Sequence, residues 1–161
     1  MPRNRLESSN APIVCQYLYY KERHSSGETR WVKLPVVAID LKSEHAHYVT
    51  VALVDSGAER TFLQKQDAEL LELTPVKNKD GTNKTAVALG AGARFACDIM
   101  VVPELRLMDG NDSFHTFRSV QVWVPGDVDK IPISILGRDT VFRHFDITFQ
   151  EGRKQISFRR P

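Results

Sequence analysis

The sequence predicts one domain that is mostly antiparallel β, folded as a barrel or a folded sheet, with one clear helix. Many short runs rich in β-branched and aromatic residues follow one another at close spacing, whereas only one segment has the composition of a helix. The length of 161 residues suits one domain with one core. A content of 42% apolar and 26% charged residues is typical of a folded, soluble chain.

Strands joined by polar loops are expected in the first half of the chain. Residues 13–20 are rich in β-branched and aromatic residues and predict a strand. A second strand is expected over 30–41, where Pro35 favours an edge or a start, because proline cannot donate to a ladder. A third is expected over 48–54, and the short polar link between these two runs predicts a hairpin.

The second half begins with the expected helix, over 64–75, which Pro75 would end. Residues 85–107 predict a strand, a turn of small residues and another strand. The alternation over 113–124 is that of a half-buried strand. The remaining elements are a short buried strand (131–136), one or two helical turns (138–145) and a hairpin (146–158) with its turn at Glu151 and Gly152.

The charge balance argues against a nucleic-acid partner. Lysine and arginine total 22 against 20 acids, and the resulting charge of +2 is too small to indicate one. Basic residues gather at both ends, in 3–5 and 153–160, where solvated termini are the favoured interpretation. Nucleic-acid binding through these ends is the least favoured of three possible functions, and salt-dependent binding of generic DNA would support it.

The cysteines and the N-terminus indicate a cytoplasmic protein without a membrane partner. Cys15 and Cys97 lie far apart in no metal-ligand spacing, so free thiols in a reducing compartment are expected. The first 12 residues carry no apolar segment of a secretory signal. No apolar run approaches the ~20 residues that a membrane-spanning helix needs.

Two histidines, His45 and His47, would lie on one face of a strand, a geometry that can bind a metal ion. No third ligand accompanies them, so an exposed hairpin is the favoured interpretation. Neither a metal nor a cofactor is therefore expected.

One carboxylate stands out because it follows an apolar strand directly, in "TVALVDSG". Side chains alternate along a strand, so Val49, Val51, Leu53 and Asp55 share a face. The apolar members are expected to be buried, which places Asp55 at the rim of the core. A lone carboxylate there is costly, and Gly57 allows the tight turn that presents backbone N–H donors to it.

A single acid is a poor catalyst of amide hydrolysis. One group must take a proton from water while another protonates the carbonyl oxygen. Two Asp55 residues brought together across a twofold axis can do both, because two close carboxylates share one proton and titrate as a pair. The sequence therefore predicts a homodimer.

Two motifs follow apolar strands in order along the chain. "LVDSGAERTFL" (53–63) resembles the Asp-Thr/Ser-Gly-Ala signature of retropepsin-like aspartic proteases, and "ISILGRDTVFRHFDITF" (133–149) resembles their second signature. The resemblance covers about residues 30–158, and is to the small bacterial, archaeal or retroelement members. It implies a retropepsin-like acid-protease β-barrel protomer, mostly β with one or two short helices. Residues 30–161 would form the protease domain, and 1–29 an N-terminal lead with an extra strand.

The resemblance also assigns roles by position in the first signature. Asp55 would be the catalytic acid, one from each subunit. Ser56 would join the two active-site loops across the dimer axis, Gly57 would contact substrate through its backbone, and Ala58 completes the signature. Arg60 stands where the retroviral enzymes often have a second acid.

Three further sets of residues follow from the same resemblance. A structural ion pair is expected between Glu59 and Arg138. The mobile flap that closes over substrate would contain Leu89, Gly90, Ala91 and Gly92. The second signature comprises Leu136, Gly137, Arg138 and Asp139.

The sequence thus predicts an aspartic endopeptidase that hydrolyses an extended peptide or protein substrate with a pair of Asp55 residues across a homodimer. The alternative is a catalytically silent retropepsin-like module that binds peptides or mediates dimerisation. The presence of Asp55 argues against this alternative, because a pure binder has no need of so costly an acid.

Overall fold

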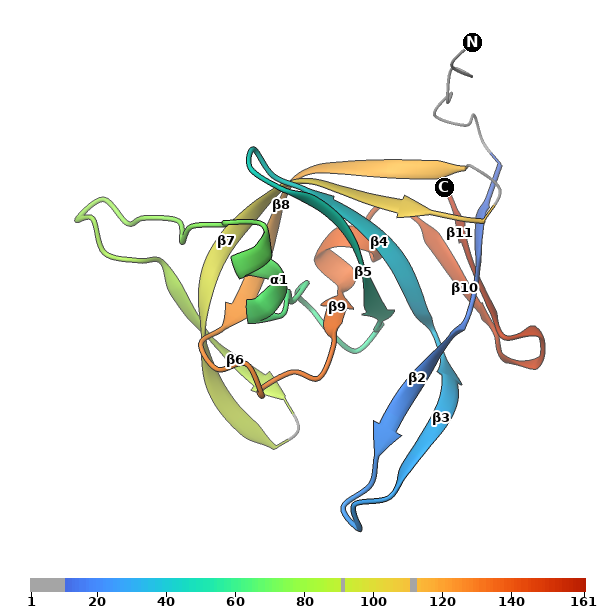
Figure 1. The fold of residues 1–161 in the computed structure, drawn as a ribbon. Coiled ribbons are helices and arrows are strands. Elements are labelled where there is room, and N and C mark those ends of the chain that lie inside the picture. The colour runs from blue at the N-terminus through green and yellow to red at the C-terminus, as the bar shows by residue number, and fades with distance from the viewer. Residues whose placement is uncertain (1–10, 91, 111–112) are drawn as a thin grey trace.

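The computed structural model describes residues 11–90, 92–110 and 113–161, and these are mostly in strands (Figure 1). Ala91 of the expected flap and residues 1–10 of the N-terminal lead lie outside the described residues. The strands are β1 (Ile13–Gln16), β2 (Leu18–Arg23), β3 (Thr29–Leu34), β4 (Val36–Lys42), β5 (His47–Val54), β6 (Thr85–Gly90), β7 (Ala93–Met108), β8 (Phe114–Pro125), β9 (Ser134–Leu136), β10 (Asp146–Gln150) and β11 (Gln155–Arg159). The helical segments are α1 (Lys65–Leu70), one turn of π-helix (Arg138–Phe142) and one 3₁₀ turn (Glu151–Arg153).

The largest sheet carries the two sequence motifs. Its strand order is β6-β7-β4-β5-β9, and β8 pairs with β7. All of its pairs are antiparallel except β5 with β9, which run parallel and bring the ends of the two motifs side by side. Over the described residues the sheet does not close on itself, so the folded sheet rather than the closed barrel describes it.

Two smaller units flank this sheet. β1, β11 and β10 form a three-stranded antiparallel sheet, which confirms the hairpin expected over 146–158. The strand expected over 13–20 is divided at Tyr17, and its second part pairs with β3 as a ribbon that projects from the body of the molecule (Figure 1). Pro35 separates β3 from β4, which agrees with its expected place at a strand boundary. The division of the chain at residue 29 stays a prediction.

The core lies where β4, β7 and β8 meet the terminal sheet. β4 supplies Val37, Ile39 and Leu41, each at most 1% exposed, and β11 supplies Ile156 and Phe158, both fully buried. Burying one such side chain contributes roughly 1.5–3 kcal/mol. The alternating pattern along these strands therefore fixes which of their faces is inside.

The helix is shorter than the 64–75 that the sequence predicts. It ends at Leu70, and Glu72 takes a φ of 53°, the left-handed region. The chain then runs beside β7, where the Val76 N–H donates to the Ile99 carbonyl at 2.8 Å. Tertiary pairing has overridden the local helical propensity. Within the described residues, no helix is both long and apolar enough to cross a membrane.

The two cysteines are buried free thiols, as expected. Burial raises the pKa of the Cys15 thiol to about 12, and the charge of Asp109 adds to the effect. Burial likewise raises the pKa of the Cys97 thiol to about 11, with a contribution from Asp98. Both side chains therefore act as small hydrophobic groups rather than nucleophiles.

Candidate active site

Asp55 lies in a tight turn just beyond the end of β5. Its own N–H donates to the carbonyl of Leu136, at 3.2 Å, and its carbonyl accepts from the N–H of Ala58 at 3.2 Å. The Gly57 N–H donates to the Asp55 carboxylate oxygen Oδ1 at 2.8 Å. A Cβ at position 57 would lie 3.2 Å from that same oxygen. Glycine is therefore suited to this position because it lets the backbone approach the acid.

The loop after Asp55 and the segment around β9 are held together by backbone hydrogen bonds. Phe62 and Ile135 exchange two of them, at 2.9 and 2.8 Å. Further along, the Arg138 N–H donates to the Ala58 carbonyl at 2.8 Å, and the Asp139 N–H donates to the Glu59 carbonyl at 3.2 Å. The second motif thus fixes the position of the loop after Asp55 through backbone hydrogen bonds.

Gly137 is the point of closest approach between the two motifs. A Cβ there would lie 2.1 Å from the Arg60 carbonyl oxygen and 3.0 Å from that of Ala58. The Gly137 N–H also donates to the Thr61 hydroxyl at 3.0 Å. No side chain fits between these groups, which explains why a glycine follows the apolar run of the second motif.

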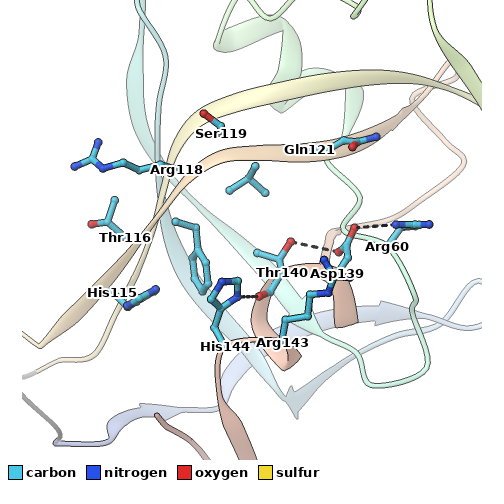
Figure 2. A pocket seen from close by; sticks show the side chains of 12 residues that line it. Arg60, His115, Thr116, Arg118, Ser119, Gln121, Asp139, Thr140, Arg143 and His144 are labelled. Atoms are coloured by element: carbon cyan, nitrogen blue, oxygen red, sulfur yellow. Dashed lines mark hydrogen bonds and ion pairs between the residues drawn. The ribbon is translucent and has the colours of Figure 1, made fainter. Parts of the chain in front are cut away.

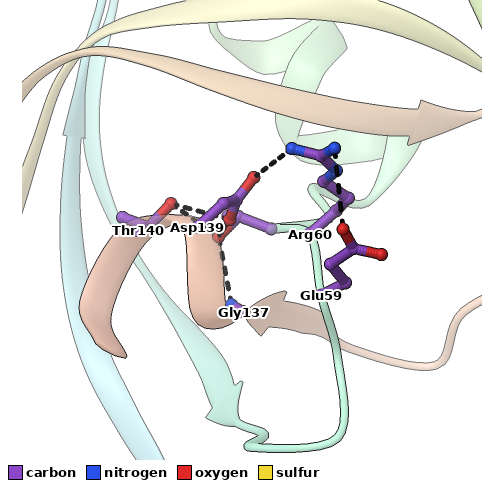
Figure 3. A network of polar contacts seen from close by, with 6 residues as sticks. Glu59, Arg60, Gly137, Asp139 and Thr140 are labelled. Carbon is purple, nitrogen blue, oxygen red and sulfur yellow. Dashed lines mark hydrogen bonds and ion pairs between the residues drawn. The ribbon is translucent and has the colours of Figure 1, made fainter. Parts of the chain in front are cut away.

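A buried polar network lies behind the loop (Figure 3). The Thr61 hydroxyl donates to Asp139 Oδ1 at 3.0 Å, and the hydroxyls of Thr61 and Thr140 are 2.7 Å apart. Both threonines are at most 5% exposed. Sequence reasoning assigned no role to either, although each stands within one motif. Their hydrogen bonds join the first motif to the second.

The expected ion pair between Glu59 and Arg138 is not formed by these side chains. Glu59 is 80% exposed and lies 3.8 Å from Arg60, and Arg60 in turn lies 4.0 Å from Asp139. Arg138 is exposed, and it is joined to the first motif through its backbone N–H. Figure 3 shows the Arg60 guanidinium between the two acids. Arg60 therefore occupies the place that the sequence reasoning gave to Arg138.

A cleft of about 690 Å³ opens in front of Asp55 and runs to the hairpin of β6 and β7. Leu89 and Gly90 of the expected flap line it, and Gly92 beside the hairpin tip has a φ of 76° that favours glycine. Val87 and Leu89 are 63% and 75% exposed, which is unusual for apolar side chains. The hairpin that the resemblance assigns to the flap therefore lies at the cleft, and its role as a mobile flap stays a prediction.

Three aromatic side chains form an apolar part of the cleft wall. Phe62 packs against Trp123, with ring centroids 5.9 Å apart, and against Phe95 at 6.3 Å. All three rings line the cleft. No motif in the sequence connects Trp123 with Asp55. The long separation of β7 and β8 from the first motif left no local signal for this contact.

The strand face that leads to Asp55 is exposed, contrary to expectation. Val49 is 58% exposed and Val51 is 39% exposed, whereas Ala52 and Val54, on the other face, are at most 2% exposed. β5 is apolar on both faces, so its sequence could not indicate which one meets the core. The prediction that Val49 and Val51 are buried was wrong.

The chain offers little to a metal ion in the part that the structure describes. No group of three or more histidine, cysteine, aspartate or glutamate side chains converges there. His47 contacts the carboxylate of Asp40 on the neighbouring strand.

Comparison with known proteins agrees with the resemblance of the two motifs to aspartic proteases. A family model described as aspartyl protease matches residues 44–140. No curated protein sequence matches the chain. A solved structure of a retropepsin-like aspartic protease from Rickettsia conorii matches with a TM-score of 0.53 and 14% identity, over 93% of this chain and 91% of that one. The family model spans more than half of the chain, so the chain belongs to the aspartyl protease family, and its fold resembles that of the retropepsin-like protease.

Proposed function

We propose that the protein is an aspartic endopeptidase whose active site is completed by two Asp55 residues in a homodimer. The observation that carries the proposal is the geometry of Asp55. Its carboxylate accepts a hydrogen bond from the Gly57 N–H at 2.8 Å. The loop that carries it is joined to the second motif by backbone hydrogen bonds, and Asp55 lines the same cleft as the β6–β7 hairpin.

The chemistry needs one ionised and one protonated carboxylate. The ionised Asp55 takes a proton from water as the water oxygen attacks the scissile carbonyl carbon, while the protonated Asp55 of the second subunit donates to the carbonyl oxygen. Sharing of one proton between two aspartates is the established behaviour of aspartic proteases. In the collapse, the Asp55 that is now protonated donates its proton to the leaving nitrogen, while the other Asp55 takes a proton from a hydroxyl of the tetrahedral intermediate. The C–N bond then breaks, the acid and the amine are released with one proton left on the pair, and no covalent bond to the enzyme forms.

Among the described residues that line the cleft of one subunit, none is suited to serve as the second catalytic carboxylate. Glu59, the other acid among its described lining residues, is 80% exposed and faces Arg60. The exposed Val49 and Val51 on the face that leads to Asp55 provide apolar surface near the loop for a second subunit. Ser56 is exposed and its hydroxyl makes no hydrogen bond with the described residues, which leaves it available to a partner loop.

Substrate would bind as an extended chain between the β6–β7 hairpin and the floor of the cleft. The hairpin offers backbone groups near Gly90 for pairing with an added strand. Val87, Leu89 and the three aromatic rings make most of the wall apolar, which favours apolar side chains next to the scissile bond. The cytoplasm stays the predicted location.

The test is cleavage of a proteome-derived peptide library by wild type and Asp55→Asn, from about pH 4 to pH 7, the range that brackets a shared proton. Cuts by the wild type that are absent from Asp55→Asn are expected. Asp146→Asn, at an exposed position of β10, is the matched control and should cut like the wild type. Equal cutting by Asp55→Asn would refute the proposal, and no cutting by a folded wild-type dimer would favour the silent peptide-binding module.

A further inference from the structure

A second pocket of about 510 Å³ lies beside the catalytic cleft, between β8 and the turn that carries the second motif (Figure 2). Its floor is formed by buried groups, including Phe117, Val120 and Thr140. At its edge the ladder of β7 and β8 is interrupted, because Ser119 takes a φ of 51° and is left out of the pairing. Ser119 itself is one of the residues that line the pocket.

The pocket carries an excess of positive charge. Three arginines line it, Arg60, Arg118 and Arg143, against a single carboxylate, that of Asp139. Asp139 is already engaged, since it accepts the Thr61 hydroxyl at 3.0 Å and lies 4.0 Å from Arg60. Arg60 thus offsets the one carboxylate among the lining residues, and Arg118 and Arg143 remain to be accounted for.

The two remaining arginines differ in their partners. Arg118 is 74% exposed and reaches Glu104, at 2.9 Å, on the neighbouring strand. Arg143 is exposed and forms no ion pair with any described residue. Beside it, His144 Nδ1 donates to the Thr140 carbonyl at 2.7 Å, which fixes the imidazole ring. The pocket therefore presents the uncompensated guanidinium of Arg143 to an incoming anion.

Arg60 connects this pocket to the catalytic cleft, because it lines both. Its guanidinium lies 3.8 Å from Glu59 and 5.8 Å from the ring of Trp123, which are both on the cleft side. On the other side it lies 4.0 Å from Asp139. A peptide that leaves the cleft past Arg60 thus arrives directly at the second pocket.

We propose that this pocket receives an acidic side chain of the substrate, from the segment that leaves the cleft past Arg60. The inference rests on the proposed function, because it takes the cleft to hold an extended peptide. Arg143 would bind the carboxylate, and Arg118 would add long-range attraction. The buried floor of Phe117 and Val120 would pack against the methylene groups of a glutamate.

The first test measures binding without turnover. The full chain with Asp55→Asn is titrated with a peptide of alternating Glu and Ala that carries a neutral dye, and with the same peptide containing Gln for Glu. We expect the Glu peptide to bind about fivefold more tightly or better at low salt, and the difference to shrink at high salt, because exposed charges are screened.

Removal of the pocket's charge should abolish that difference. Adding Arg118→Gln and Arg143→Gln should bring the two peptides to within about twofold of each other. The matched control adds Arg23→Gln and Arg153→Gln, two exposed arginines outside the pocket, and should keep the full difference. Circular dichroism confirms that each variant is folded. Equal binding of both peptides to the parent, or a difference that survives loss of Arg118 and Arg143, overturns the proposal.

A second arm uses the active enzyme and separates this proposal from the proposed function. Peptides that the wild type cleaves are resynthesised with Gln for each Asp or Glu. A rise in KM with little change in kcat at one flanking position is expected, and it should vanish in the Arg118→Gln, Arg143→Gln enzyme. If the wild type cleaves nothing, the proposed function fails, while the binding measurement still decides whether the pocket selects acidic peptides.

Discussion

Replacing Gly137 by alanine tests whether the two motifs are held together as the structure indicates. Gly137 has a φ of −95°, which any residue can adopt, so the substitution adds only a steric demand. The new Cβ would lie 2.1 Å from the Arg60 carbonyl oxygen, whereas contacts under 3.0 Å are essentially never seen, so the two segments must separate by about 0.9 Å (3.0 minus 2.1).

That separation disturbs two hydrogen bonds between the motifs. They are the 2.8 Å bond from the Arg138 N–H to the Ala58 carbonyl and the 3.0 Å bond from the Gly137 N–H to the Thr61 hydroxyl. Leaving a buried polar group without its partner costs about 1–2 kcal/mol. For two broken hydrogen bonds, we therefore expect the free energy of unfolding to fall by about 2–4 kcal/mol. For a domain of this size, that corresponds to a fall in Tm of roughly 4–16 °C.

The assay is thermal unfolding followed by circular dichroism, with Gly152→Ala as the matched control. A Cβ added at Gly152 would have no atom within 4 Å, and the residue has no positive φ, so its replacement should leave Tm nearly unchanged. Loss of peptide cleavage by Gly137→Ala below its Tm is also expected, because a displacement of about 1 Å at a catalytic group can cost about 100-fold in rate. A Tm for Gly137→Ala within about 1 °C of the wild type would contradict the reasoning.

Three further predictions concern the buried carboxylate, the hairpin and the thiols. Ser134→Ala removes the hydroxyl that donates to the buried Asp67 at 2.9 Å, and should lower the unfolding free energy in urea by about 1–3 kcal/mol, whereas an unchanged midpoint would contradict this. Leu89→Ala, on the exposed side of the hairpin, should reduce kcat/KM about tenfold while Tm stays the same, and an unchanged kcat/KM would remove the hairpin from substrate binding. Because the pKa values of both thiols are raised, only a small fraction of each is thiolate at neutral pH, and this fraction rises about tenfold per pH unit up to the pKa. Labelling by a disulfide reagent should therefore be slow in the folded protein and accelerate with pH. Fast labelling of the folded protein at neutral pH would contradict the burial of Cys15 and Cys97.

Local chemistry made the motifs predictable. A carboxylate directly after an apolar strand, followed by glycine, indicated a turn with backbone donors, and the Gly57 N–H does donate to Asp55. The apolar run that ends at Gly137 indicated a strand followed by a short helical turn, and β9 and the π-helical turn occupy those positions. Each of these features depends on residues within a few positions of one another, which is why the sequence reveals them.

Long-range contacts were not predictable in the same way. The ion pair expected at Glu59 is made by Arg60, and no short-range pattern distinguishes the arginine positions 60 and 138. The exposure of Val49 and Val51 depends on which side of β5 meets the core, and that is decided by β4 and β7, whose side chains fill the interior. The second pocket likewise joins residues of β8 to residues of the second motif and to Arg60, which are far apart in the sequence.

The most direct test of the central claim is to measure cleavage and sedimentation over the same range of protein concentration. If the site needs two Asp55 residues, the activity per chain should rise with concentration and follow the fraction of dimer, because a monomer holds half of a site. Subunits carrying Asp55→Asn, added in excess, should suppress the wild-type activity by forming mixed dimers. Constant activity per chain from a protein that sediments only as a monomer would contradict the account.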